Sequence, residues 1–134
     1  MEAVIRHLGN MKFEAMARGH RLLCDQPAEN QGTDRGMTPP ELLLASLGTC
    51  AGYYAAHYLQ TRGLGDGRVA VRVTAEKATQ PMRLASFVIE VEAPDVDPRH
   101  HDGLMRAVKA CLIHNTLTNT PNIELHVHTA APVA

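Results

Sequence analysis

Hydrophobic and polar positions along this 134-residue chain follow three successive patterns: short mixed segments, a long helical repeat, and then two-residue alternation. The first 25 residues are mixed segments separated by turn signals at Gly9-Asn10 and Arg18-Gly19-His20, which predicts two or three N-terminal strands. Residues 26–37 are polar and include two glycines and one proline, which predicts a loop long enough to carry function.

A long helix is predicted to begin at Thr38, because Thr38 and Glu41 form a capping-box pattern with Pro39 at the first helical position. Arg62-Gly63 supplies a basic last turn and a C-terminal glycine. Between these ends one stripe repeats at helical spacing, made of Leu43, Leu47, Cys50, Tyr54 and Tyr58. The pattern therefore places Cys50 midway along a largely buried helix of about six or seven turns.

Period-two alternation, typical of half-buried strands, dominates most of the rest of the chain. Residues 69–76 and 85–91 predict two strands of a hairpin joined through residues 77–83. Residues 123–128 predict a half-buried closing strand. The apolar positions of these strands are Val69, Val71, Val73, Ala75, Ala85, Phe87, Ile89, Val91, Ile123, Leu125 and Val127.

A second helix is predicted to begin near Asp97-Pro98, with Leu104, Val108 and Cys111 on one face, and to break or restart close to Cys111. The order strands, long helix, hairpin, helix, strand predicts an α+β fold with a mainly antiparallel sheet, in a single domain over residues 1–134. The long helix is apolar on more than one side, and one small chain cannot easily cover it. We therefore expect an intertwined homodimer.

Charge and composition narrow the classes of partner. The formal net charge is −1 and the 13 basic residues are scattered, so we expect no nucleic-acid partner. The chain has neither an apolar run of signal-peptide length at its N-terminus nor the ~20 apolar residues that span a bilayer, so we expect a cytoplasmic protein without membrane contact. Three cysteines in a reducing compartment favour free, catalytic or metal-bound thiols.

Cys50 and Cys111, 61 residues apart, each interrupt an apolar helix face with a group that can ionise, attack and form a disulfide. Each could equally be a small buried hydrophobe, which is how we interpret Cys24. No Cys-x-x-Cys or His-x-x-x-His pair exists, so we expect no metal and no cofactor. A zinc site built from Cys50, Cys111, His57 and His114 stays open as an alternative.

Two stretches around these cysteines resemble the OsmC/Ohr family of thiol-dependent peroxidases, the osmotically inducible and organic hydroperoxide resistance proteins. The resembling parts are Asp25-Gln26-Pro27, the segment 36–50 (GMTPPELLLASLGTC) and the segment 110–116 (ACLIHNT). The resemblance implies an OsmC-like fold, an intertwined dimer with two active sites at the subunit interface, a peroxidatic thiol at Cys50 and a resolving thiol at Cys111.

The same resemblance implies oxidative stress defence through reduction of a small organic hydroperoxide. Cys50 thiolate would attack the distal peroxide oxygen, Cys111 would capture the sulfenic acid as a disulfide, and an external dithiol, a lipoyl protein or a thioredoxin-like protein, would reset the pair. The apolar helix residues Leu43, Leu47 and Tyr54 favour an organic hydroperoxide over hydrogen peroxide.

Members of the family hold the thiolate with an arginine that pairs with a glutamate ten residues before the cysteine. Pro40 occupies that position here, and Glu41 lies nine residues before Cys50, about 100° round the helix. Arg18 and Arg35 are both candidates for the thiolate-stabilising cation. The family's proline and aromatic residue after the second cysteine are replaced by residues 112–114 (LIH), so a different substrate preference is expected. The alternative to an enzyme is a dimeric small-molecule binding protein that keeps the fold but has little or no peroxidase activity.

Overall fold

The computed structural model describes residues 1–65 and 68–130, and this part of the chain has the predicted mixture of antiparallel strands and helices. The elements run, in order, β1 (Val4–Gly9), β2 (Lys12–Ala17), β3 (His20–Cys24), η1 (Ala28–Asn30), α1 (Pro39–Thr61), β4 (Ala70–Ala78), β5 (Arg83–Glu92), η2 (Pro98–His100), α2 (His101–Lys109) and α3 (Leu112–Thr118). The α+β prediction is confirmed.

The N-terminal strands form an antiparallel sheet in the order β1-β2-β3. Both turns fall where the sequence predicted them, and Arg18 and Gly19 take left-handed backbone angles, with φ of 51° and 83°. Ala17 pairs with His20, so these two residues form the tight two-residue hairpin turn that requires positive φ. Arg18 therefore stands at an exposed turn tip.

Helix α1 begins with the predicted capping box at Thr38 and has proline in its first turn. The stripe that it buries deepest is Leu47, Ala51, Ala55 and Leu59, one position round from the predicted stripe. Small residues determine which stripe is buried. A Cβ added at Gly48 would lie 3.0 Å from the Val73 side chain, so the absence of a side chain at Gly48 lets the helix approach β4 closely. Cys50 lies beside the buried stripe and is half-buried.

The second sheet is the predicted hairpin of β4 and β5, which packs on α1. Val73 pairs with Ile89 and Ala75 with Phe87, as the alternation predicted. An irregularity between Glu76 and Lys77 shifts the register. In consequence Leu84 is half-buried and Ala85 is exposed, which corrects the predicted inward position of Ala85.

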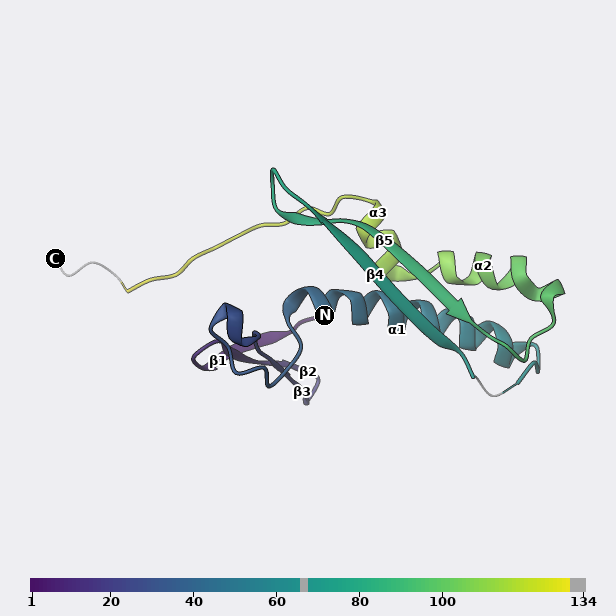
Figure 1. Cartoon of the computed structure of the whole chain (residues 1–134), viewed down its shortest axis with the longest axis horizontal. Coiled ribbons are helices and arrows are strands. Elements are labelled where there is room, and N and C mark those ends of the chain that lie inside the picture. Colours follow the sequence, from purple (N-terminus) through teal and green to yellow (C-terminus); the bar gives the residue numbers. More distant parts are fainter. Residues whose placement is uncertain (66–67, 131–134) are drawn as a thin grey trace.

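The predicted break in the second helix is confirmed at Cys111, which lies between α2 and α3. Both short helices pack against α1, and so does the hairpin, so α1 is the element that the rest of the C-terminal part shares (Figure 1). Strands β1, β2 and β3 pack mainly on one another, beside the first turn of α1. No helix in the described ranges is long and apolar enough to span a membrane.

The predicted closing strand at residues 123–128 is wrong for the single chain. Residues 120–130 are extended without a strand partner and run away from the rest of the molecule (Figure 1). Ile123, Leu125 and Val127 are 82%, 86% and 77% exposed. An alternation of apolar and polar residues forms a strand only where the edge of a neighbouring strand supplies backbone hydrogen bonds. The described part of this chain places no such strand edge beside the segment.

Candidate active site

The fold brings Cys50 and Cys111 together although they are 61 residues apart in the sequence. Cys50 comes from the middle of α1 and Cys111 from the start of α3, and these helices pack on each other. The two side chains are close enough to share a hydrogen bond, and both are free thiols. The site is therefore a pair of neighbouring free thiols.

Cys111 is fully buried and serves as the N-cap residue of α3. Its Sγ accepts the backbone N–H of His114 at 3.4 Å. Burial raises the pKa of the Cys111 thiol, and the hydrogen bond to Cys50 raises it further, while the backbone N–H groups of His114 and Ile113 oppose the shift. The raised pKa keeps Cys111 protonated at neutral pH.

Cys50 is the more accessible member of the pair, because it is half-buried whereas Cys111 has no exposed surface. A hollow of about 530 Å³ lies next to the pair. Tyr54, one turn after Cys50, contributes to it, as do Ala110 and Leu112 on either side of Cys111. Neighbours of both cysteines thus line this hollow, and Cys50 is the member of the pair that keeps some exposed surface.

Glu41 completes the capping box. Its Oε1 accepts hydrogen bonds from the Thr38 backbone N–H at 2.9 Å and from the Thr38 hydroxyl at 2.8 Å. These donors, the backbone N–H first, lower the pKa of the Glu41 carboxyl. The carboxylate is thus engaged in starting α1, and Glu41 forms no ion pair with an arginine among residues 1–65 and 68–130.

The candidate arginines are not assembled with the thiols in one chain. Arg18 is exposed at the turn between β2 and β3, and Arg35 is exposed on the loop before α1. In the part of the chain that the structure describes, the Cys111 sulfur accepts the backbone N–H of His114, and no arginine side chain donates to it. A cation beside the pair would have to come from elsewhere.

Asp25 is a buried carboxylate whose role in holding the loop before α1 the sequence did not reveal. It is fully buried, and its carboxylate accepts hydrogen bonds from Gln26 N–H (2.8 Å), Thr33 N–H (3.3 Å), Thr33 Oγ1 (2.7 Å) and Arg35 N–H (3.0 Å). Burial opposes its charge, but the four donors, that of Arg35 foremost, outweigh this and lower its pKa to about 2. The available signal was a carboxylate directly after an apolar strand and before a glycine-containing loop.

The loop held by Asp25 is also joined to β3. The Asp25 N–H donates to the Met37 carbonyl at 3.3 Å, and Cys24 forms a parallel bridge with Met37. At Gly36 a Cβ would lie 2.3 Å from the Leu23 carbonyl oxygen, so only glycine fits this approach. These contacts fix the position at which α1 begins, and place Arg35 on an ordered loop.

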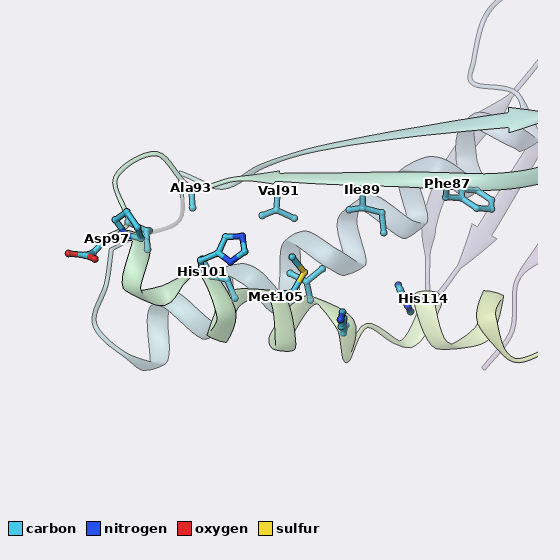
Figure 2. Close-up of a pocket in the computed structure, with 13 residues that line it drawn as sticks. Phe87, Ile89, Val91, Ala93, Asp97, His101, Met105 and His114 are labelled. Atoms are coloured by element: carbon cyan, nitrogen blue, oxygen red, sulfur yellow. The ribbon is translucent and has the colours of Figure 1, made fainter.

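The alternative zinc site is not formed in this chain. His57 lies on the exposed side of α1, where it stacks on Tyr53 with ring centroids 5.9 Å apart. The His114 side chain instead lines a groove between β5 and α2 (Figure 2). Among the residues described, no three histidine, cysteine, aspartate or glutamate side chains come close enough to hold a metal ion.

A two-sheet α+β fold with a long helix and a second helix segment that present paired cysteines defines the class of this protein. The family model described as OsmC-like protein matches residues 32–126, and the chain belongs to that family. The matched range includes both Cys50 and Cys111. No functionally curated protein matches the chain.

Solved structures share the fold at low sequence identity. A Psychrobacter arcticus protein, provisionally described as an osmotic stress induced and detoxification response protein, has a TM-score of 0.75 and 18% identity, covering 85% of each chain. An OsmC-like protein from Mycoplasma pneumoniae has a TM-score of 0.68 and 21% identity, covering 89% of this chain and 86% of its own. An organic hydroperoxide resistance protein OsmC from Legionella pneumophila has a TM-score of 0.61 and 15% identity, covering 89% of this chain and 90% of its own.

Proposed function

We propose that the protein is a thiol-dependent peroxidase that reduces small organic hydroperoxides in oxidative stress defence. The observation that carries the proposal is the close approach of a half-buried thiol, Cys50, to a fully buried one, Cys111. Membership of the OsmC-like family and the fold shared with an organic hydroperoxide resistance protein support it.

In the proposed reaction the Cys50 thiolate attacks the distal oxygen of ROOH. The O–O bond breaks, the alkoxide leaves and takes up a proton as ROH, and the sulfur is oxidised by two electrons to a sulfenic acid. The Cys111 thiol then attacks that sulfur, a disulfide forms and water leaves. An external dithiol, from a lipoyl protein or a thioredoxin-like protein, returns two electrons and two protons by thiol–disulfide exchange.

The division of roles follows from burial. Cys50 keeps some exposed surface and can meet a peroxide, whereas Cys111 is enclosed and can meet only a sulfur already inside the protein. The raised pKa of Cys111 suits this second role, since its thiol stays protonated until Cys50 is oxidised.

The proposal includes a homodimer in which a second copy supplies the cation that each thiol pair lacks. Arg18 and Arg35 are the candidates, and Glu41 is the candidate carboxylate partner. Support comes from the exposed apolar side chains of β1, Val4, Ile5 and Leu8, and from those of the extended C-terminal segment. One chain leaves these surfaces uncovered.

The test is turnover of cumene hydroperoxide with a dithiol reductant. Wild-type protein should consume peroxide catalytically, and Cys50→Ser should abolish turnover while leaving the fold intact by circular dichroism. Arg18→Met and Arg35→Met decide between the arginines, because the variant that lacks the thiolate partner should lose more than about tenfold in rate. Unchanged turnover in Cys50→Ser would refute the peroxidase proposal.

A second candidate function is small-molecule binding with little peroxidase activity. The observation that favours it is a groove of about 780 Å³ between β5 and α2, larger than the hollow beside the thiols. Two thiols that never form a disulfide on oxidant treatment would favour this function over the first.

A further inference from the structure

Three tyrosines lie in the second half of α1, and the structure gives each a different environment. Tyr53 is 62% exposed and stacks on His57, with ring centroids 5.9 Å apart. The Tyr58 hydroxyl shares a hydrogen bond of 3.2 Å with Nδ1 of His100. Tyr54 is half-buried, and its hydroxyl has no hydrogen-bond partner in the described part of the chain. Because no buried polar side-chain atom is left unpartnered there, the Tyr54 hydroxyl keeps exposed surface and is available to a bound molecule.

Tyr54 lies on the side of α1 that faces the thiol pair. It comes one turn after Cys50, so the two side chains share a face of the helix. A long side chain in a helix leans toward the N-terminus of that helix, which directs the Tyr54 ring over the turn that carries Cys50. The same side chain lines the hollow next to the pair, together with Ala110 and Leu112 on either side of Cys111. The phenol is therefore adjacent to the segments that carry both cysteines.

The other polar side chains that line this hollow do not supply a proton. The Thr116 hydroxyl donates to the Leu112 carbonyl at 2.8 Å, and the Asn119 amide donates to the Asn115 carbonyl at 2.9 Å. The Asn115 side chain is an amide, which can donate a hydrogen bond but does not give up its proton. A phenol, in contrast, is a much stronger acid than water and is still protonated at neutral pH. Among the described residues around the hollow, Tyr54 is thus the proton donor.

Reduction of a hydroperoxide requires a proton at the oxygen that leaves. When the Cys50 thiolate bonds to the distal oxygen, the O–O bond breaks and its electron pair stays on the proximal oxygen. The product would be a strongly basic alkoxide unless a proton reaches this oxygen as the bond breaks. A side chain that donates the proton in the transition state accelerates such a step by general acid catalysis.

We propose that Tyr54 is the general acid of this reaction, an assignment that rests on the proposed peroxidase function. The Tyr54 O–H bond breaks together with the O–O bond, the proton goes to the proximal oxygen, and ROH leaves. The Cys50 sulfur loses two electrons, which the peroxide takes up, and becomes the sulfenic acid. The Tyr54 phenolate then takes a proton from water and returns to its starting state.

The experiment compares two peroxides that differ in whether the leaving oxygen needs a proton. Cumene hydroperoxide releases a basic alkoxide, whereas peroxybenzoic acid releases benzoate, which is stable without a proton. The reduced protein is mixed with an excess of each peroxide, and the loss of free thiols is followed over a single turnover. Tyr54→Phe should slow the reaction with cumene hydroperoxide more than about tenfold, and should leave the reaction with peroxybenzoic acid within about twofold of the wild-type rate.

Two controls separate the hydroxyl from the packing of the ring. Tyr53→Phe removes the same group from the neighbouring position, which does not line the hollow, and should react as wild type does with both peroxides. Alkylation of Cys50 by iodoacetamide, measured on the Cys50 peptide by mass spectrometry, should be equally fast in Tyr54→Phe and wild type. Iodide leaves without a proton, so this reaction reports on the thiolate alone.

The outcomes distinguish this assignment from the peroxidase proposal. A wild-type rate with cumene hydroperoxide in Tyr54→Phe, or equal losses with both peroxides, would overturn the assignment of Tyr54. Slower alkylation of Cys50 in this variant would also overturn it, because Tyr54 would then act on the thiolate. In each of these cases wild-type protein still reduces the hydroperoxide. Wild-type protein that reacts with neither peroxide would refute the peroxidase function, and the assignment with it.

Discussion

At the scale of single residues, burial and hydrogen bonding determine what the two thiols and the Asp25 carboxylate can do. Cys50 and Cys111 have the same chemistry, and burial separates a half-buried thiol from an enclosed one. Asp25 is a charged residue without exposed surface, and it is tolerated because four donors surround its carboxylate. The buried Asp25 carboxylate thus holds the loop before α1 in one conformation.

Asp25 also makes stability depend on pH. Its pKa is lowered from 3.8 to about 2 in the folded chain, so its stabilising contribution is fully present above about pH 4 and is lost as the pH falls toward 2. Asp25→Asn should therefore destabilise the protein at neutral pH, and the difference from wild type should shrink in acid. Urea unfolding of both proteins from pH 7 to pH 2.5 measures it, and a difference independent of pH would contradict the account.

A second prediction at this scale concerns the resolving thiol. Cys111→Ser should still reduce one equivalent of hydroperoxide, but the sulfenic acid at Cys50 should persist because no thiol captures it. Dimedone labelling followed by mass spectrometry should find the adduct on Cys50 in this variant and much less in wild type. Equal labelling of both proteins would mean that Cys111 does not resolve Cys50.

At the scale of elements, the start of α1 is defined by a capping box that the sequence predicted and the structure confirms. Thr38→Ala should cost about 1 kcal/mol of unfolding free energy, since it removes the acceptor for Glu41 N–H and a donor to the Glu41 carboxylate. Thr49→Ala is the matched control, because Thr49 is exposed within the helix and bonds only carbonyls of its own helix. Urea unfolding should show no loss, or a slight gain, for that control.

Local signals predicted the elements well, and interactions between distant segments limited the rest. Turn residues and the capping box depend on a few neighbouring positions, so the strands β1 to β3, the hairpin and the start of α1 were predictable. The buried stripe of α1 was predicted one position away, because the close approach of Gly48 to Val73 is a tertiary contact. The register irregularity that exposes Ala85 was missed for the same reason.

The candidate site was predictable only in part. The sequence marked Cys50 and Cys111 as unusual, but their contact depends on how α3 packs on α1, and the expectation that they pair came from the family resemblance. The hydrogen-bond role of Asp25 was hidden, since its donors Thr33 and Arg35 are eight and ten residues away. A cation at the thiols could not be located, because neither candidate arginine lies there in one chain.

At the scale of the whole molecule, the single chain leaves apolar surface that we expect a second copy to cover. Leu125→Lys should weaken the proposed dimer by about tenfold or more, because a buried leucine contributes roughly 1.5–3 kcal/mol. Its side chain is 86% exposed in one chain, so the fold of the protomer should be unaffected. His126→Lys, on the opposite face of the same segment, is the control. Sedimentation equilibrium measures both, and equal association of the two variants would contradict the expected role of this segment.

The central claim is that Cys50 and Cys111 act together on an organic hydroperoxide. The most direct measurement treats the reduced protein with one equivalent of cumene hydroperoxide and follows free thiols and the linked Cys50 and Cys111 peptides by mass spectrometry. The account predicts rapid loss of two thiols per chain with these peptides joined, faster than with hydrogen peroxide. Thiols that remain free, or a disulfide that involves Cys24 instead, would contradict it.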